Sequence, residues 1–232
     1  MTGPKIGFDY RIHLGDMDMA ADIWLTEGRL TPARLQPEMG HIAGLGSRKK
    51  AITVLSRLWS RPIWQEGLGR ELLRDLLVQD HRVAYWGLLM VAYPFAAQGA
   101  SDIGRLLMIQ DELTTRHVNL AILRRLGESE KVRVATRKLL ITLSDWNVLV
   151  RPSRGVYKVS LCHPLNSALA KTFLTYCALL VEDATRLTLS DIEHLPWLFP
   201  FKVTISPRDF DNFPDFSIER NGPHELKVGM VH

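Results

Sequence analysis

Cysteines and long apolar runs are scarce in this chain of 232 residues. Two cysteines, Cys162 and Cys177, are too few for the disulfide scaffold of a small secreted protein. The longest apolar run, Val83 to Ala97, has 15 residues and contains Pro94, so it is too short to cross a bilayer. No apolar segment resembling a secretion signal precedes it. These absences predict a reduced, cytoplasmic protein with no membrane partner.

Signatures of catalysis and metal binding are also missing. The sequence contains no Walker motif and no nucleophile elbow, and GLGREL at Gly67 is a fragment of a dinucleotide fingerprint inside a helical pattern. The segment Cys162-His163, with Cys177 and His194, lacks a recognised zinc spacing. We therefore predict a protein that is not an enzyme and that needs no cofactor or metal.

One alternative with metal chemistry stays open. Asp209, Asp211 and Asp215 are paired carboxylates that would suit a magnesium-dependent nuclease. They alternate with Phe210, Phe213 and Phe216, a pattern more typical of a loop that packs on a core.

Acidic residues are rare between Arg116 and Lys158. That segment has ten basic and three acidic residues, a net charge of +7, whereas the rest of the chain has 19 basic and 22 acidic residues, a net charge of −3. Concentrated positive charge attracts polyanions and displaces their counterions. The segment is therefore the first candidate for binding nucleic acid.

Hydrophobic content of 46% is ample for a packed core, and the patterns predict a mainly α fold with a small β component. An N-terminal helical domain is expected over 1–98, with one helix capped by Ser47. The third region, 161–232, is expected to be a β-rich extension that starts with a helix over Pro164–Asp183. Asn221-Gly222 near its end is a hairpin signal.

The sequence pattern of the middle region, 99–160, predicts a winged helix-turn-helix. An amphipathic helix over Ser101–Gln110 precedes a helix that ends at Gly127. The next helix is expected over Ser129–Trp146, followed by two short strands around an Arg-Pro-Ser-Arg-Gly turn. This is the element order of a winged helix.

The helix over Ser129–Trp146 separates apolar from basic residues. Val132, Ala135, Leu139, Leu143 and Trp146 share one arc of a helical wheel, and the basic side chains fall outside it. Arg151, Arg154 and Lys158 are expected on or near the wing. A second basic group follows Gly46, where a helix N-terminus favours phosphate. The predicted DNA-binding residues are Arg48, Lys49, Lys50, Arg116, Arg124, Lys131, Arg133, Arg137, Lys138, Arg151, Arg154 and Lys158.

Three segments carry a resemblance to a known family. They are GSRKKAITVLSRL, YWGLLMVAYPF and ATRKLLITLSDWNVLVRPSRGVY. Across roughly residues 17–160 the pattern resembles BrxA, the small accessory protein of BREX phage-defence systems. The resemblance implies a helical N-terminal part, a winged-helix-like part, DNA binding and a non-enzymatic role beside larger defence proteins.

Two functions remain open from the sequence. The first is a protein that binds double-stranded DNA electrostatically, with little sequence preference, through the winged helix. The alternative is a structural or adaptor subunit of a multiprotein complex that uses the same unit for docking. Val134 and Ile141, apolar positions outside the buried arc, would suit the adaptor.

Overall fold

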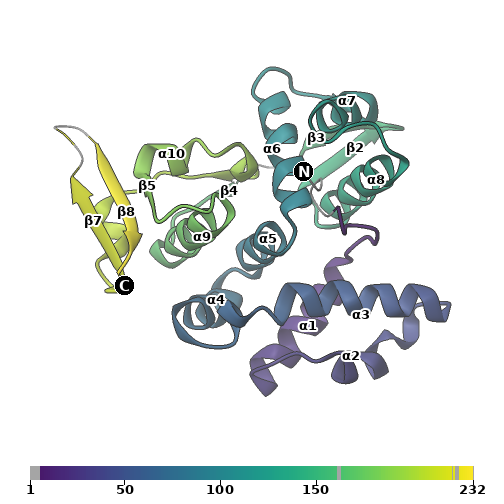
Figure 1. Cartoon of the computed structure of the whole chain (residues 1–232), viewed down its shortest axis with the longest axis horizontal. Coiled ribbons are helices and arrows are strands. Elements are labelled where there is room, and N and C mark those ends of the chain that lie inside the picture. Colours follow the sequence, from purple (N-terminus) through teal and green to yellow (C-terminus); the bar gives the residue numbers. More distant parts are fainter. Residues whose placement is uncertain (1–5, 161–162, 221, 223–224, 232) are drawn as a thin grey trace.

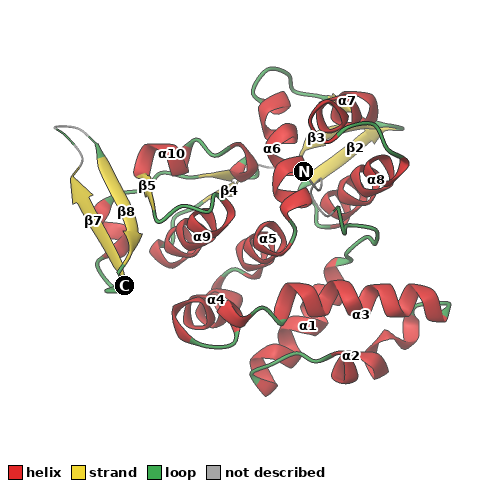
Figure 2. Cartoon of the chain, viewed as in Figure 1, coloured by secondary structure: helices red, strands yellow, loops and turns green. Residues whose placement is uncertain are grey.

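The computed structural model describes residues 6–160, 163–220, 222 and 225–231, and it is mainly helical with three small sheets in these ranges. Figures 1 and 2 show the N-terminal helices α1–α3 below a unit of helices and strands, with the C-terminal strands at the opposite end of the molecule. No helix in the described part of the chain has the length and apolarity needed to cross a membrane.

The N-terminal helices enclose a core rich in aromatic residues. Trp59 packs between Trp24 and Tyr85, with ring centroids 6.1 and 6.2 Å away. The cap predicted at Ser47 is wrong, because α3 begins earlier, after Gly44 at a φ of +86°, which a residue with a side chain rarely adopts. The elements are α1 (Leu14–Glu27), α2 (Pro32–Glu38), η1 (Met39–His41), α3 (Leu45–Trp59), η2 (Pro62–Trp64), α4 (Gly67–Gln79) and α5 (His81–Ala92).

The next helix, α6 (Pro94–Leu107), corrects the prediction over Ser101–Gln110. Proline needs no hydrogen-bond acceptor at the first helical position, so Pro94 starts a new helix directly after α5 instead of only ending the previous one. The boundary expected between residues 98 and 99 consequently falls inside α6.

The basic segment forms two helices and a sheet. The elements are β1 (Leu113–Thr114), α7 (Thr115–Leu126), α8 (Glu130–Asp145), β2 (Leu149–Ser153) and β3 (Val156–Val159). The strands form an antiparallel sheet in the order β1-β3-β2. Gly127 ends α7, Ser129 caps α8 and Trp146 follows it, so the helix limits predicted here are confirmed. Strand β1 was missed, because two residues are too short for a periodic pattern.

The C-terminal part contains strands at both ends of a central helix. Its elements are β4 (His163–Pro164), α9 (Ala168–Val181), β5 (Arg186–Thr188), α10 (Leu189–Glu193), η3 (Pro196–Leu198), β6 (Phe201–Lys202), η4 (Pro207–Phe210), β7 (Phe216–Arg220) and β8 (Leu226–Met230). Strand β8 lies between β5 and β7, with Phe216 opposite Met230, so the predicted hairpin is confirmed. Asn221 and Cys162 lie outside the described residues.

The C-terminal elements share one core with the helices before them. A Cβ placed on Gly87 of α5 would lie 2.3 Å from Phe173 Cε1 of α9, and one on Gly104 of α6 would lie 1.9 Å from the Pro196 carbonyl oxygen. Both distances are shorter than any real carbon contact, so glycine is needed for these close approaches. The extension is therefore packed against α5 and α6.

Candidate nucleic-acid interface

Helix α8 buries one face and exposes the basic one. The Ser129 hydroxyl accepts a hydrogen bond from the Val132 N–H at 3.2 Å and fixes the start of the helix. The predicted apolar arc is buried throughout, and Thr136, Leu140 and Thr142 are buried beside it. Because these residues widen the buried arc, the side chains left in solvent are concentrated on the opposite side.

The cations of α8 differ in their neighbours. Lys131 and Arg137 are exposed, and neither has a carboxylate within 4.0 Å among the residues described. Arg133 is also exposed but lies 3.8 Å from Glu128, a long and solvated ion pair. Val134 and Ile141 are half-buried on this side. The face thus has at least two cations whose charge is available to a polyanion.

The β2–β3 hairpin projects further arginines. Arg154 and Gly155 form the turn, with Gly155 at a φ of +78°, and both Arg154 and Arg151, which lies in β2, are exposed. The predicted Arg-Pro-Ser-Arg-Gly turn is therefore too long, because β2 continues to Ser153. The Arg151 guanidinium lies over the Tyr157 ring, 5.6 Å from its centroid. This contact orients the arginine without cancelling its charge.

Lys158 is less available than the sequence indicates. Its ammonium lies 2.8 Å from a Glu112 carboxylate oxygen, and this hydrogen bond and charge raise the pKa of Lys158 above its ordinary value. The charge of Lys158 is therefore balanced by Glu112 in the free protein. To contact a phosphate, Lys158 would first have to break this ion pair.

The start of α7 lies against the hairpin turn. The Thr115 N–H donates to the Gly155 carbonyl at 2.9 Å, and this contact brings the neighbouring residues Arg116 and Arg154 to the same end of the unit. Arg124, at the other end of α7, is exposed as well. By contrast, Arg125 pairs with the buried Asp102 at 2.6 Å and is a structural residue.

The basic group on α3, which comprises Arg48, Lys49 and Lys50 and is called the α3 cluster below, is largely engaged internally. Arg48 donates to the carbonyls of Ile42 at 3.0 Å and Gly40 at 3.3 Å, so its guanidinium holds the loop before α3. Lys50 pairs with Asp9 at 3.2 Å. Lys49 is exposed.

The segment before α1 is fastened to the end of α8. Thr142 Oγ1 accepts from the Ile12 N–H at 3.0 Å, and the Trp146 indole N–H donates to the Ile12 carbonyl at 3.0 Å. Asp145 Oδ2 accepts from the Leu14 N–H at 2.7 Å and so caps α1, whose own N-cap residue, His13, makes no side-chain capping bond. The sequence gives no local signal for contacts between residues about 130 positions apart.

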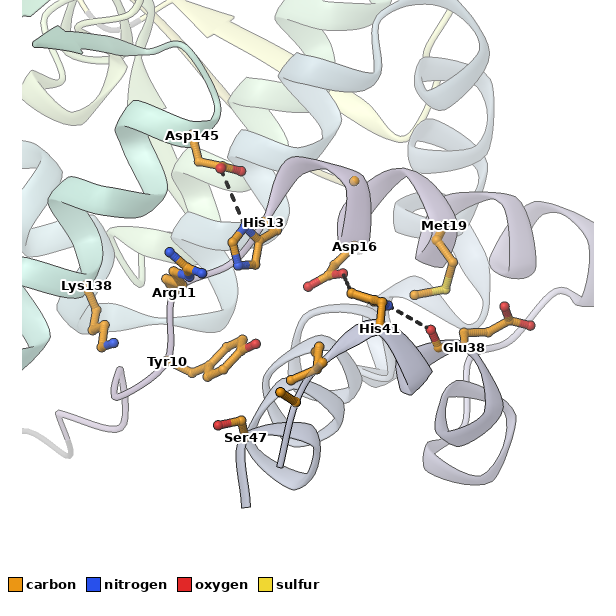
Figure 3. Close-up of a pocket in the computed structure, with 13 residues that line it drawn as sticks. Tyr10, Arg11, His13, Asp16, Met19, Glu38, His41, Ser47, Lys138 and Asp145 are labelled. Carbon is orange, nitrogen blue, oxygen red and sulfur yellow. Dashed lines mark hydrogen bonds and ion pairs between the residues drawn. The ribbon is translucent and has the colours of Figure 1, made fainter. Parts of the chain in front are cut away.

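This fastening creates a groove between α8 and the N-terminal helices, which we call the Tyr10 groove (Figure 3). Its volume is about 980 Å³, and its lining includes Tyr10, Arg11, Ser47 and Lys138. Lys138 of α8 was predicted to face DNA beside Arg137, but it instead lines the same hollow as Ser47 at the start of α3. Arg11 belongs to no charged run in the sequence and was missed.

The carboxylates that suggested a nuclease are not arranged as one. Lys171 Nζ lies 3.0 and 3.2 Å from the two oxygens of Asp209, and Ser206 donates to the same carboxylate. Burial alone would raise the pKa of Asp209, but the bonds from Ser206 and Lys171 hold it below its ordinary value. Within the described ranges, no group of three or more His, Cys, Asp or Glu side chains is placed to hold a metal ion.

The structure therefore leaves most of the predicted cations exposed to solvent. The exposed cations of α8 and of the β2–β3 hairpin, which we together call the α8–wing surface, are Lys131, Arg133, Arg137, Arg151 and Arg154. Lys138 lines the Tyr10 groove, whereas Lys49 and Lys50 of the α3 cluster line a separate hollow together with Asp9. Comparisons of the chain with protein-family models, with curated proteins and with solved structures find no match.

Proposed function

We propose that this chain is a cytoplasmic, non-enzymatic protein that binds double-stranded DNA, with residues 94–159 acting as a winged-helix unit. The order α6, β1, α7, α8, β2, β3 and the sheet order β1-β3-β2 support this assignment. In winged helices the last helix enters the major groove and the hairpin lies along the adjacent backbone. Helix α8 and the β2–β3 hairpin would take these two roles.

The observation that carries the proposal is the unpaired charge of the α8–wing surface. Lys131 and Arg137 on α8 and Arg154 on the hairpin have no carboxylate within 4.0 Å in the described part of the chain. When such cations bind to DNA phosphates, they displace the counterions that were condensed there. The release of these counterions gives an affinity that depends on salt and has little sequence preference.

The resemblance to BrxA suggests a setting for this binding. It rests on the three sequence segments given above, which correspond to α3, α5 and the α8–hairpin unit. We propose that the protein acts beside larger proteins of a phage-defence system.

A matched set of binding titrations tests the proposal. The wild-type protein and an Arg133→Gln/Arg137→Gln variant are titrated with blunt duplex DNA, single-stranded DNA and duplex RNA at several salt concentrations. Each phosphate contact contributes about 0.9 to the slope of log affinity against log salt, so the variant should lose about 2 units of slope. Unchanged affinity and slope in a folded variant would reject this surface as the DNA site.

A second candidate function is protein docking, which one observation favours. Met108 and Ile109, at the end of α6, are 77% and 82% exposed, although large apolar side chains are usually covered. An adaptor would use this pair and would co-purify with a partner in the absence of nucleic acid. A Met108→Ser/Ile109→Ser variant should lose that partner and keep its duplex affinity.

A further inference from the structure

The acidic residues that line the Tyr10 groove are already engaged. Asp16 lies 3.1 Å from His41 Nε2, and Glu38 lies 2.7 Å from an Arg34 nitrogen. Asp145 accepts from the first N–H of α1 and lies 3.5 Å from a nitrogen of His13, which also lines the groove. Each of these carboxylates therefore already has a partner within the protein.

The lysine and the arginine of the groove, unlike its carboxylates, have no ion-pair partner in the described part of the chain. Arg11 comes from the segment before α1 and Lys138 comes from α8, and neither has an ion pair with any residue in the described ranges. Figure 3 shows both on the same side of the groove as Tyr10. The first turn of α3, which begins after Gly44 without a side-chain cap, borders the groove at Ser47 and adds N–H dipoles of the same sign.

Tyr10 supplies an aromatic surface between these charges. Its side chain is half-buried and lies between Lys138, Arg11 and Ser47 in Figure 3. Burial and the nearby Asp16 raise its pKa, so the phenol stays a neutral hydrogen-bond donor at physiological pH. An accessible aromatic ring flanked by cations is the arrangement with which proteins hold unpaired bases and the phosphates that join them.

Hydrolytic chemistry does not explain the same residues. His41 Nδ1 lies 3.1 Å from the Glu38 carbonyl oxygen, and its Nε2 lies 3.1 Å from Asp16. Both ring nitrogens are therefore occupied, and neither is directed at Ser47 as a general base.

We propose that the Tyr10 groove binds unpaired nucleotides of a DNA strand that leaves the duplex held on the α8–wing surface. Lys138 follows Arg137 directly in α8, so the groove begins where the proposed duplex surface ends. A volume of about 980 Å³ is at the upper end of the range for small-ligand sites and is ample for one or two nucleotides. The position of the groove beside the duplex rests on the proposed function, but the affinity for an unpaired strand does not.

The test compares three probes on the whole chain: a blunt duplex, the same duplex with a thymidine tail of about five nucleotides, and that tail alone. The tail should tighten wild-type binding about tenfold, the effect expected of one stacked base with its phosphate contacts. Tyr10→Ala and Arg11→Ala should each remove most of this gain, while their blunt-duplex affinity stays at the wild-type value. Tyr10→Phe keeps the ring and should keep the gain.

Arg208→Ala is the matched control, because Arg208 is an exposed arginine of η4 outside both surfaces. It should leave the tail effect unchanged, and circular dichroism shows whether each variant is folded. No gain from the tail, or a gain that survives both Tyr10→Ala and Arg11→Ala, would overturn the proposal. Loss of blunt-duplex binding alone, with the tail still bound through Tyr10, would instead reject the duplex site and leave the groove standing.

Discussion

The α8–wing surface and the α3 cluster look alike in sequence and differ in the folded protein. Both are basic segments that begin near a helix start. On α3, Arg48 is bonded to the backbone of its own loop, and Lys50 is paired with Asp9. On α8, Lys131 and Arg137 extend into solvent with no carboxylate within 4.0 Å in the described chain. Charge density alone therefore does not identify a binding surface, because internal partners decide how much of the charge is available.

Reversing one charge on each surface should separate them most strongly. Arg137→Glu should weaken blunt-duplex binding about tenfold or more, because a phosphate contact becomes a repulsion. Lys50→Glu makes the same kind of change beside Asp9 and should alter binding about twofold or less. Fluorescence anisotropy at one salt concentration measures both, and equal losses would show that the two surfaces bind DNA alike.

Truncating Arg48 should lower the stability of the protein, whereas truncating Arg137 should weaken DNA binding and leave the stability unchanged. Arg48→Ala removes two hydrogen bonds to the loop carbonyls of Ile42 and Gly40 and should lower the free energy of unfolding by about 1–2 kcal/mol. Arg137→Ala should leave that free energy within about 0.5 kcal/mol, because the side chain is exposed. Urea unfolding provides the comparison. A destabilised Arg137→Ala and an unaffected Arg48→Ala would contradict it.

Asp145 connects the end of α8 to the start of α1 and should matter for stability. Asp145→Ala removes the cap of α1 and should cost about 1 kcal/mol of unfolding free energy. Asp211→Ala serves as the control, because Asp211 is exposed and should change stability by less than about 0.5 kcal/mol. Equal unfolding curves for both variants would argue against the contact between α1 and α8.

The smallest effect is expected from releasing a cation. Glu112→Gln should lower the pKa of Lys158 toward its ordinary value and free the ammonium for phosphate. Duplex affinity should rise about twofold, and the salt slope should steepen by up to about 1 unit. Stability should stay close to that of the wild-type protein, because solvent screens an exposed ion pair. Lower affinity in this variant would indicate that Lys158 lies away from the DNA.

Local patterns predicted the α8 region well, because each signal there acts within a few residues. Ser129 caps its own helix, Gly127 ends the previous one, and the buried arc repeats every three or four positions. Helix α6 was misplaced because proline both ends and starts helices, and the sequence does not say which.

The Tyr10 groove could not be predicted for a different reason. It depends on the bonds of Ile12 and Leu14 to Thr142, Asp145 and Trp146, contacts between distant segments with no shared pattern. The internal bonds of Arg48 and Lys50 likewise depend on how the chain folds back on itself. Counting charges in the sequence consequently overestimated how much positive charge the α3 cluster has available for DNA.

Lysine acetylation with and without saturating blunt duplex tests the difference between the two surfaces most directly. Lys131 and Lys50 are both exposed lysines of helices, and mass spectrometry reports the reactivity of each in one experiment. We expect the duplex to protect Lys131 and to leave Lys50 as reactive as in the free protein. Protection of Lys50 with an unprotected Lys131 would contradict the assignment of the DNA site to α8 and the wing.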